Sequence, residues 1–248
     1  PAKHIASIRE AMAGNNYIEA LNLSEEASQK YPEQTGFVQL IGENQLKLGR
    51  VEEAKRSFQR AIKLDPKYAF AIYNRGLAKY NLKDFKGSIE DYSKAIELNP
   101  ESTNSFINRG VSKDDLKDFI GAIEDYSKAI QLDPNDAAIF NNRGNTLLEL
   151  KRYKEALDDA NKAIKLNPNN INNFILRAKI NLNLFNFKKT IQDCKKVITL
   201  DSDNFIAFHC KGTANVLCRN YEKALKDLSQ AIKLSPKEYK QSSDILSL

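Results

Sequence analysis

A period of thirty-four residues constrains this chain more than any other feature of its sequence. The segment 69–102 reads AFAIYNRGLAKYNLKDFKGSIEDYSKAIELNPES, and shifting it by its own length brings Asn74-Arg75-Gly76 onto Asn108-Arg109-Gly110 and then onto Asn142-Arg143-Gly144. Prolines recur at multiples of the same length, at Pro32, Pro66, Pro100, Pro134, Pro168 and Pro236, and only Ser202 interrupts them. We therefore expect a single array over 1–238, made of repeats 1–34, 35–68, 69–102, 103–136, 137–170, 171–204 and 205–238.

Each repeat has the composition of two short helices. Apolar residues recur at helical spacing over 70–82 and again over 85–98, with a polar turn between them. We number the residues of each repeat from 1 to 34, so that its proline stands at position 32. Small residues then fall at positions 8, 20 and 27, which in the third repeat are Gly76, Ser88 and Ala95. They predict close helix packing, and Pro100 predicts the end of the second helix.

The order of glycine, aromatic residue, alanine and proline within this period resembles the tetratricopeptide repeat. That resemblance implies an all-α fold, a right-handed α-α superhelical solenoid of helix-turn-helix repeats. Because one helix pair cannot bury its apolar faces alone, stacking the repeats builds the core. Such a chain is expected to be a non-enzymatic scaffold or adaptor for protein–protein interaction.

A basic residue at position 7 accompanies an acidic residue at position 23 in repeats three to seven, and both are missing from the first two repeats. The pairs are Arg75 with Asp91, Arg109 with Asp125, Arg143 with Asp159, Arg177 with Asp193 and Lys211 with Asp227. Their joint presence predicts structural ion pairs between helices, because the arginine fork bonds both carboxylate oxygens. The alternative interpretation is that the arginines form a row that binds phosphate.

The family resemblance places positions 2, 5, 6, 9, 12 and 13 of each first helix on a concave groove. The candidate peptide-binding residues there are Asn74, Asn108, Asn142, Tyr73, Tyr80, Asn104, Asn141 and Asn145. A row of asparagine amides can bond the backbone of an extended peptide, and the tyrosines would contact its anchor residues. The row Asn74, Asn108 and Asn142 resembles an asparagine ladder, and the alternative is ordinary surface polarity.

The distribution of charge limits the classes of partner that the chain is expected to bind. The net charge is +6, yet the expected groove is nearly neutral, so nucleic acid is not expected there. The carboxylate clamp that binds acidic chaperone tails is missing, since Asn141 with Asn145 is its nearest candidate. Excess lysine lies on second helices instead, at position 26, and leaves polyanion or RNA binding through a basic outer face as the alternative. A third option is a regulatory or substrate-recruiting subunit of an enzyme complex.

Other features predict little chemistry. His209 precedes Cys210, but neighbours on a helix point about 100° apart and no third group is evident, so we expect no catalytic or metal site and no cofactor. The odd cysteine count favours a reducing, cytoplasmic location. No apolar stretch could span a membrane. The tail 239–248 is expected to cap the last repeat or, alternatively, to join two copies as a homodimer.

Overall fold

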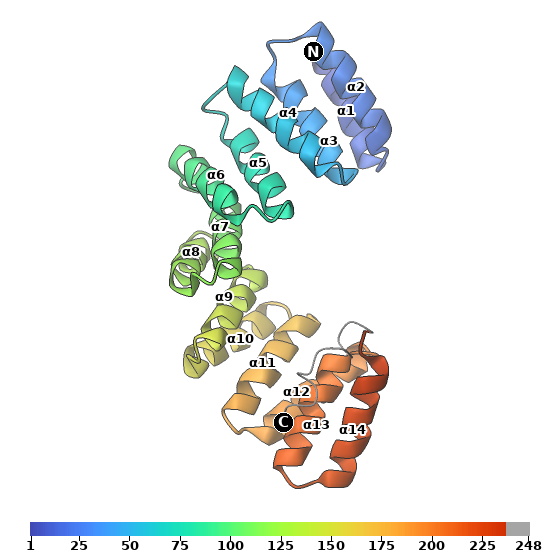
Figure 1. Cartoon of the computed structure of the whole chain (residues 1–248), viewed down its shortest axis with the longest axis vertical. Coiled ribbons are helices and arrows are strands. Elements are labelled where there is room, and N and C mark those ends of the chain that lie inside the picture. The colour runs from blue at the N-terminus through green and yellow to red at the C-terminus, as the bar shows by residue number, and fades with distance from the viewer. Residues whose placement is uncertain (237–248) are drawn as a thin grey trace. The chain divides into compact units, whose positions relative to one another are not determined.

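The computed structural model describes residues 1–236, and over that range the chain folds into helices joined by short turns (Figure 1). The helices are α1 (Ala2–Ala13), α2 (Tyr17–Lys30), α3 (Thr35–Lys47), α4 (Val51–Leu64), α5 (Ala69–Asn81), α6 (Phe85–Leu98), α7 (Thr103–Asp115), α8 (Phe119–Leu132), α9 (Ala137–Glu149), α10 (Tyr153–Leu166), α11 (Ile171–Asn183), α12 (Phe187–Leu200), α13 (Phe205–Leu217) and α14 (Tyr221–Leu234). Each repeat supplies one consecutive pair, so the predicted all-α repeat fold is confirmed.

The helices gather into two compact units. The first, Pro1–Leu132, holds α1 to α8, and the second, Asp133–Leu248, holds α9 to α14. That all seven repeats act as a single array stays a prediction. The predicted capping tail, 239–248, lies outside the described residues.

The turn within each repeat has the same backbone geometry. Position 15 is left-handed in all seven, with φ between 58° and 73°, and only Gly49 among these residues is a glycine. The others are Asn15, Lys83, Lys117, Lys151, Phe185 and Arg219. Because left-handed backbone is costly for a residue with a side chain, the repeated stacking of helices holds these turns in place.

The ends of the second helices correct the role expected of proline. α12 ends at Leu200 although Ser202 replaces the proline, at the same position where α6 ends at Leu98 before Pro100. Both helices are followed by an aspartate or asparagine at position 31, whose side chain accepts a hydrogen bond from the amide two residues later, at 3.3 Å in Asn99 and 3.2 Å in Asp201. This local turn ends the helix without proline.

The small positions of the repeat lie in the core. The position-20 residues Ala20, Ala54, Ser88, Ala122, Ala156, Thr190 and Ala224 are all at most 3% exposed. At position 8, a methyl group placed on Gly76 would lie 2.9 Å from the ring of Tyr92. The first and second helices of a repeat therefore interlock as closely as the sequence predicts.

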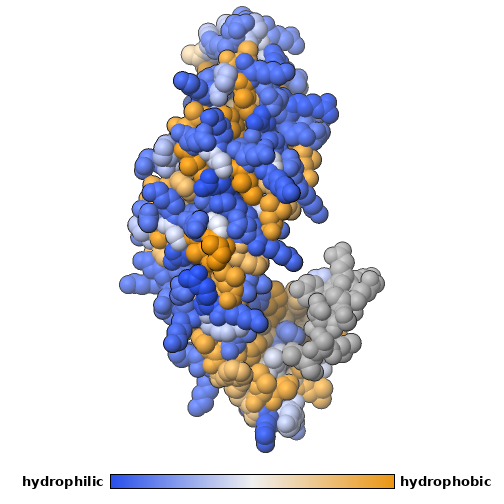
Figure 2. Space-filling model, turned by 60° about the vertical axis from the view of Figure 1, so that its left-hand side comes forward, coloured by the Kyte–Doolittle hydropathy of each residue, from blue (hydrophilic) through white to orange (hydrophobic). Residues whose placement is uncertain are grey.

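Polar side chains are prominent at one end of the surface. On the face shown in Figure 2, hydrophilic side chains cover most of the N-terminal end, with hydrophobic ones in small groups between them. Within residues 1–236, each helix is too short or too polar to cross a lipid bilayer.

Candidate functional site

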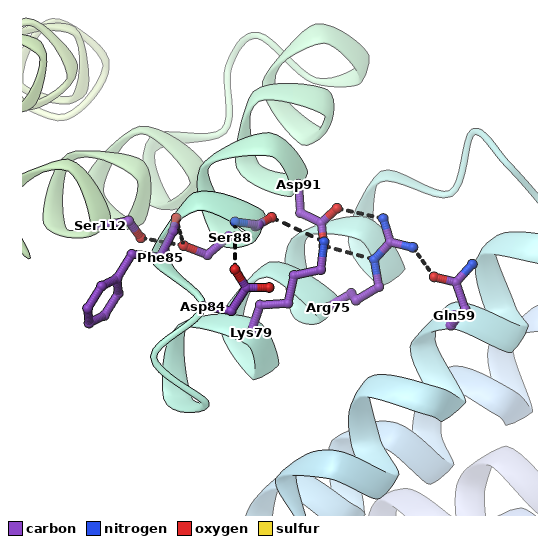
Figure 3. Close-up of polar contacts among 9 residues, drawn as sticks. Gln59, Arg75, Lys79, Asp84, Phe85, Ser88, Asp91 and Ser112 are labelled. Carbon is purple, nitrogen blue, oxygen red and sulfur yellow. Dashed lines mark hydrogen bonds and ion pairs between the residues drawn. The ribbon is translucent and has the colours of Figure 1, made fainter. Parts of the chain in front are cut away.

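The predicted ion pairs join the two helices of a repeat. Arg75 on α5 donates from Nε and Nη2 to the two carboxylate oxygens of Asp91 on α6, at 2.8 and 2.5 Å (Figure 3). The same two-bond contact recurs, with shortest distances of 2.6 Å for Arg109 with Asp125, 2.8 Å for Arg143 with Asp159 and 2.7 Å for Arg177 with Asp193. Lys211 replaces arginine in the last repeat and lies 2.9 Å from Asp227. The aspartates are buried, and the hydrogen bonds that Arg143 donates to Asp159 raise the pKa of Arg143.

These ion pairs have further hydrogen-bond and salt-bridge partners that the sequence pattern did not predict. Arg75 also donates to Gln59 on α4, the second helix of the preceding repeat, as Figure 3 shows, and Arg177 donates to Asn161 in the same way at 2.9 Å. Lys79, one turn after Arg75, lies 3.0 Å from Asp91, and Lys113 lies 2.8 Å from Asp125. Arg75 and Arg177 thus each tie three helices together, which favours a structural role over a phosphate site.

Two predicted binding residues of the first unit have inward-facing amides. Asn74 is only 7% exposed and donates to the carbonyl oxygen of Phe70 on its own helix, at 3.0 Å. Asn108 donates to the hydroxyl of Tyr73 at 2.7 Å, which links α7 to α5. The ladder stays a prediction, and in this arrangement the side-chain amide nitrogens of Asn74 and Asn108 already have protein partners.

A second bond between α5 and α7 involves Tyr80, whose hydroxyl donates to Asp115 at 2.8 Å. Burial, this hydrogen bond and the carboxylate charge together raise the pKa of Tyr80 to about 12. Burial also raises the pKa of Tyr73, partly offset by the hydrogen bond from Asn108. Both tyrosines are therefore neutral hydrogen-bonding groups at ordinary pH, and they fix the spacing of the two first helices.

The remaining predicted asparagines divide between the units. Asn104 on α7 is exposed. In the second unit, Asn145 donates to the carbonyl oxygen of Asn141 at 2.8 Å, and Asn141 donates to Asn173 on α11 at 3.0 Å. Asn142 is partly buried on α9. Asn141 and Asn145 thus form a local network that reaches the next first helix.

A hollow of about 350 Å³ opens between α5, the end of α6 and the start of α7, and we call it the α5–α7 hollow. It is lined by Tyr68, Ala69, Phe70, Tyr73, Ala95, Asn99, Ser102, Asn104 and Ser105. Phe70 is 48% exposed, a large fraction for a phenylalanine, and it lies beside the half-buried Tyr73. The hollow combines an apolar aromatic wall with polar side chains of α7, so two of the predicted residues, Tyr73 and Asn104, share one concave surface.

The three cysteines of the second unit lie in two different environments. Cys194 and Cys210 are buried in the core of the second unit, whereas Cys218 is exposed at the end of α13. In the part of the chain that the structure describes, no group of three histidine, cysteine or acidic side chains could hold a metal ion.

Comparison with known proteins gives repeat matches and fold neighbours. A family model described as "Tetratricopeptide repeat" matches residues 69–102 and 137–170, and one described as "TPR repeat" matches 42–83 and 115–151. No curated protein sequence matches the chain significantly.

Several solved structures share the fold at low identity. A tetratricopeptide repeat protein from Parabacteroides merdae is 18% identical with a TM-score of 0.73, covering 99% of this chain and 96% of its own. PilF of Pseudomonas aeruginosa is 21% identical with a TM-score of 0.72, covering 90% and 96%. YrrB, described as a TPR protein with an unusual peptide-binding site, is 22% identical with a TM-score of 0.63, covering 75% and 95%. These matches, added to the repeat period and the helix pairs, identify tetratricopeptide repeats over 42–102 and 115–170 of the chain, and the solved structures share its fold.

Proposed function

We propose that this protein is a non-enzymatic scaffold that binds an extended segment of a partner protein at the α5–α7 hollow. The tetratricopeptide fold is in general a scaffold for protein–protein interaction. The observation that carries the finer proposal is the 48% exposure of Phe70 in a hollow shared with Tyr73 and Asn104. Aromatic residues at the centre of a pocket commonly supply most of the binding energy of an interface.

The surface is also held in place before any partner arrives. The hydrogen bonds from Asn108 to Tyr73 and from Tyr80 to Asp115 join α5 to α7 at 2.7 and 2.8 Å. A surface that is already ordered loses little conformational entropy on binding, so weak contacts suffice for useful affinity. The peptide-binding site named for YrrB is a property of that protein and supports the proposal by analogy.

The chemistry of the hollow defines the expected ligand. Phe70 and Tyr73 would contact one large apolar side chain, while the exposed amide of Asn104 offers a donor and an acceptor to the peptide backbone. A volume of about 350 Å³ holds one such side chain with its flanking backbone. We expect a short segment with a single aromatic or large aliphatic anchor.

Selection from a phage-displayed library of twelve-residue peptides provides a probe for this test. The selected peptides should share an apolar anchor, and the double change Phe70→Ala with Asn104→Ala should weaken their binding about tenfold or more. Ile120→Ala is the matched control, because Ile120 is an exposed apolar residue of the same unit, 57% accessible on α8, and does not line the hollow.

Affinities are measured by isothermal titration, and helix content is checked by circular dichroism. Peptides that bind the double variant as well as the unchanged chain would refute the proposal. Equal weakening by Ile120→Ala would show a general loss of apolar surface instead of a site.

A further inference from the structure

A second hollow in the first unit differs in chemistry from the α5–α7 hollow. It has a volume of about 470 Å³ and lies against α4, α5 and the start of α6, and we call it the α4 hollow. One face of α4 lines it with four cations, Lys55, Arg56, Arg60 and Lys63. Arg75 and Lys79 of α5 lie on the same hollow and are the residues that hold Asp91.

Most of the cations on α4 have no carboxylate of their own. Among residues 1–236, Arg56, Arg60 and Lys63 are exposed and take part in no ion pair, while Lys55 lies 2.7 Å from Glu52. Asp84 is the one acidic residue lining the hollow, and its carboxylate accepts the Gly87 amide at 3.0 Å as the cap of α6. Six cations thus line the hollow with one carboxylate, while Asp91 pairs with Arg75 and Lys79 and Glu52 pairs with Lys55, so the hollow has excess positive charge.

The cations are spread along the helix. From Lys55 to Lys63 the rise is about 12 Å at 1.5 Å per residue, which is the length of three or four residues of extended chain. A single phosphate could contact only part of this row. Several carboxylates spaced along a peptide match it better, and arginine at two of the positions suits carboxylate recognition.

The row does not continue into neighbouring repeats. At the positions equivalent to Arg56 and Lys63, the next repeat has Glu90 and Glu97 on α6, and Lys94 pairs with Glu97 at 2.7 Å. The preceding second helix, α2, places Glu25 and Glu26 at the positions equivalent to Gln59 and Arg60. A nucleic acid backbone needs a longer basic track, so a short acidic ligand is favoured.

We propose that the α4 hollow is a second binding site, specific for a short acidic peptide segment with several carboxylates. This site lies apart from the α5–α7 hollow and shares no lining residue with it, so it stands whether or not that hollow binds a peptide. The two sites would bind different features of partner proteins: the α5–α7 hollow an apolar anchor residue, and the α4 hollow a run of aspartate or glutamate.

The probe is a fluorescein-labelled hexaglutamate peptide, with hexaglutamine as the neutral control. Binding to the full chain is followed by fluorescence anisotropy at low salt. The double change Arg60→Gln with Lys63→Gln should weaken hexaglutamate binding about tenfold, because two charged contacts are removed while the side chains stay long. Hexaglutamine should show no saturable binding.

The chain supplies its own matched control. Lys162 and Lys165 on α10 occupy the same repeat positions as Arg60 and Lys63, and they are exposed as well. The double change Lys162→Gln with Lys165→Gln removes the same charge and should leave the affinity within about twofold. Melting curves of both variants establish that each is folded.

Three outcomes would overturn the proposal. Equal weakening by both double changes would mean a general attraction to net charge. Absence of hexaglutamate binding to the unchanged chain would mean that no such site exists. Tighter binding of a twelve-nucleotide oligouridylate, weakened by both variants, would assign the basic surface to nucleic acid.

Discussion

Two hollows at the same position of the repeat, one in each unit, differ in the charge around them. The α4 hollow of the first unit has a counterpart 102 residues later, a hollow of about 200 Å³ between α10, α11 and α12 that we call the α10 hollow. Gln59 and Arg75 correspond there to Asn161 and Arg177, and the bonds among them are kept. By contrast, Lys55 and Lys79 are replaced by Leu157 and Asn181.

This comparison separates two roles of charge. The arginine at position 7 pairs with its buried aspartate in both units, at 2.5 Å for Arg75 and 2.7 Å for Arg177, so the pair belongs to the architecture of the repeat. On α4, by contrast, Arg56 and Lys63 are exposed, and the equivalent positions of α6 hold Glu90 and Glu97. Residues of the first kind should affect stability, and residues of the second kind should affect binding.

The largest expected effect is on the shared arginine. Arg75→Ala and Arg177→Ala should each lower the free energy of unfolding by about 3 kcal/mol, because each leaves a buried aspartate without its main partner. Arg60→Ala, an exposed change on α4, should cost less than about 0.5 kcal/mol. Urea unfolding followed by circular dichroism checks all three, and unchanged stability of Arg177→Ala would remove the distinction between the two roles.

The glycines at position 8 offer a smaller test of how differently the two units pack. A methyl group on Gly110 would lie 2.8 Å from the ring of the buried Tyr126, whereas one on Gly144 would meet the flexible end of Leu176 at 2.9 Å. Gly110→Ala should lower the free energy of unfolding by about 1 kcal/mol, because overpacking outweighs the gain in helix propensity.

Gly144→Ala should be neutral or stabilising, by up to about 1 kcal/mol, because Leu176 can move aside. Both variants are measured by urea unfolding against the unchanged chain. Equal destabilisation at the two sites would show that the identity of the facing side chain does not matter.

The smallest effect concerns alkaline pH. Burial raises the pKa of Tyr73, Tyr80, Tyr92 and Tyr126, all in the first unit. A raised folded pKa means that the neutral phenol stabilises the fold below the ordinary pKa near 10, and this stability is lost as pH rises. For Tyr80 the loss falls between about pH 10 and its folded pKa of about 12.

Tyr80→Phe should therefore lose less stability than the unchanged chain between pH 9 and about pH 11.5. The comparison between the two chains cancels the titration of lysines, which both share. Urea midpoints at the two pH values provide the measurement, and identical shifts in both chains would exclude a contribution from Tyr80.

Much of the fold was predictable because it repeats. The period placed the helices of the third repeat at 70–82 and 85–98, and the structure has them at Ala69–Asn81 and Phe85–Leu98. The ion pairs followed from the joint presence of their members. Lys79 and Lys113 could have been added from sequence, because each stands one helical turn after its arginine.

Other features need three-dimensional information. The bond between Tyr73 and Asn108 joins residues 35 apart, and no composition rule pairs them. The left-handed turns at Lys83 and Phe185 have no sequence signal, because glycine marks that position only at Gly49. The α4 hollow could not be predicted, because it forms only where α4 packs against α5 and α6. Its cations are visible in the sequence, where they make 51–64 a basic second helix.

The most direct measurement is an amide chemical-shift map of the isotope-labelled chain with each of two probes, hexaglutamate and a selected apolar-anchor peptide. Hexaglutamate should shift amides of α4 and leave those of α10 unchanged, and the selected peptide should shift amides around Phe70 and Asn104. Two separate sets of shifted amides would support two sites of different chemistry in the first unit. Equal hexaglutamate shifts on α4 and α10, or one set of shifted amides shared by both probes, would contradict the proposal of two sites.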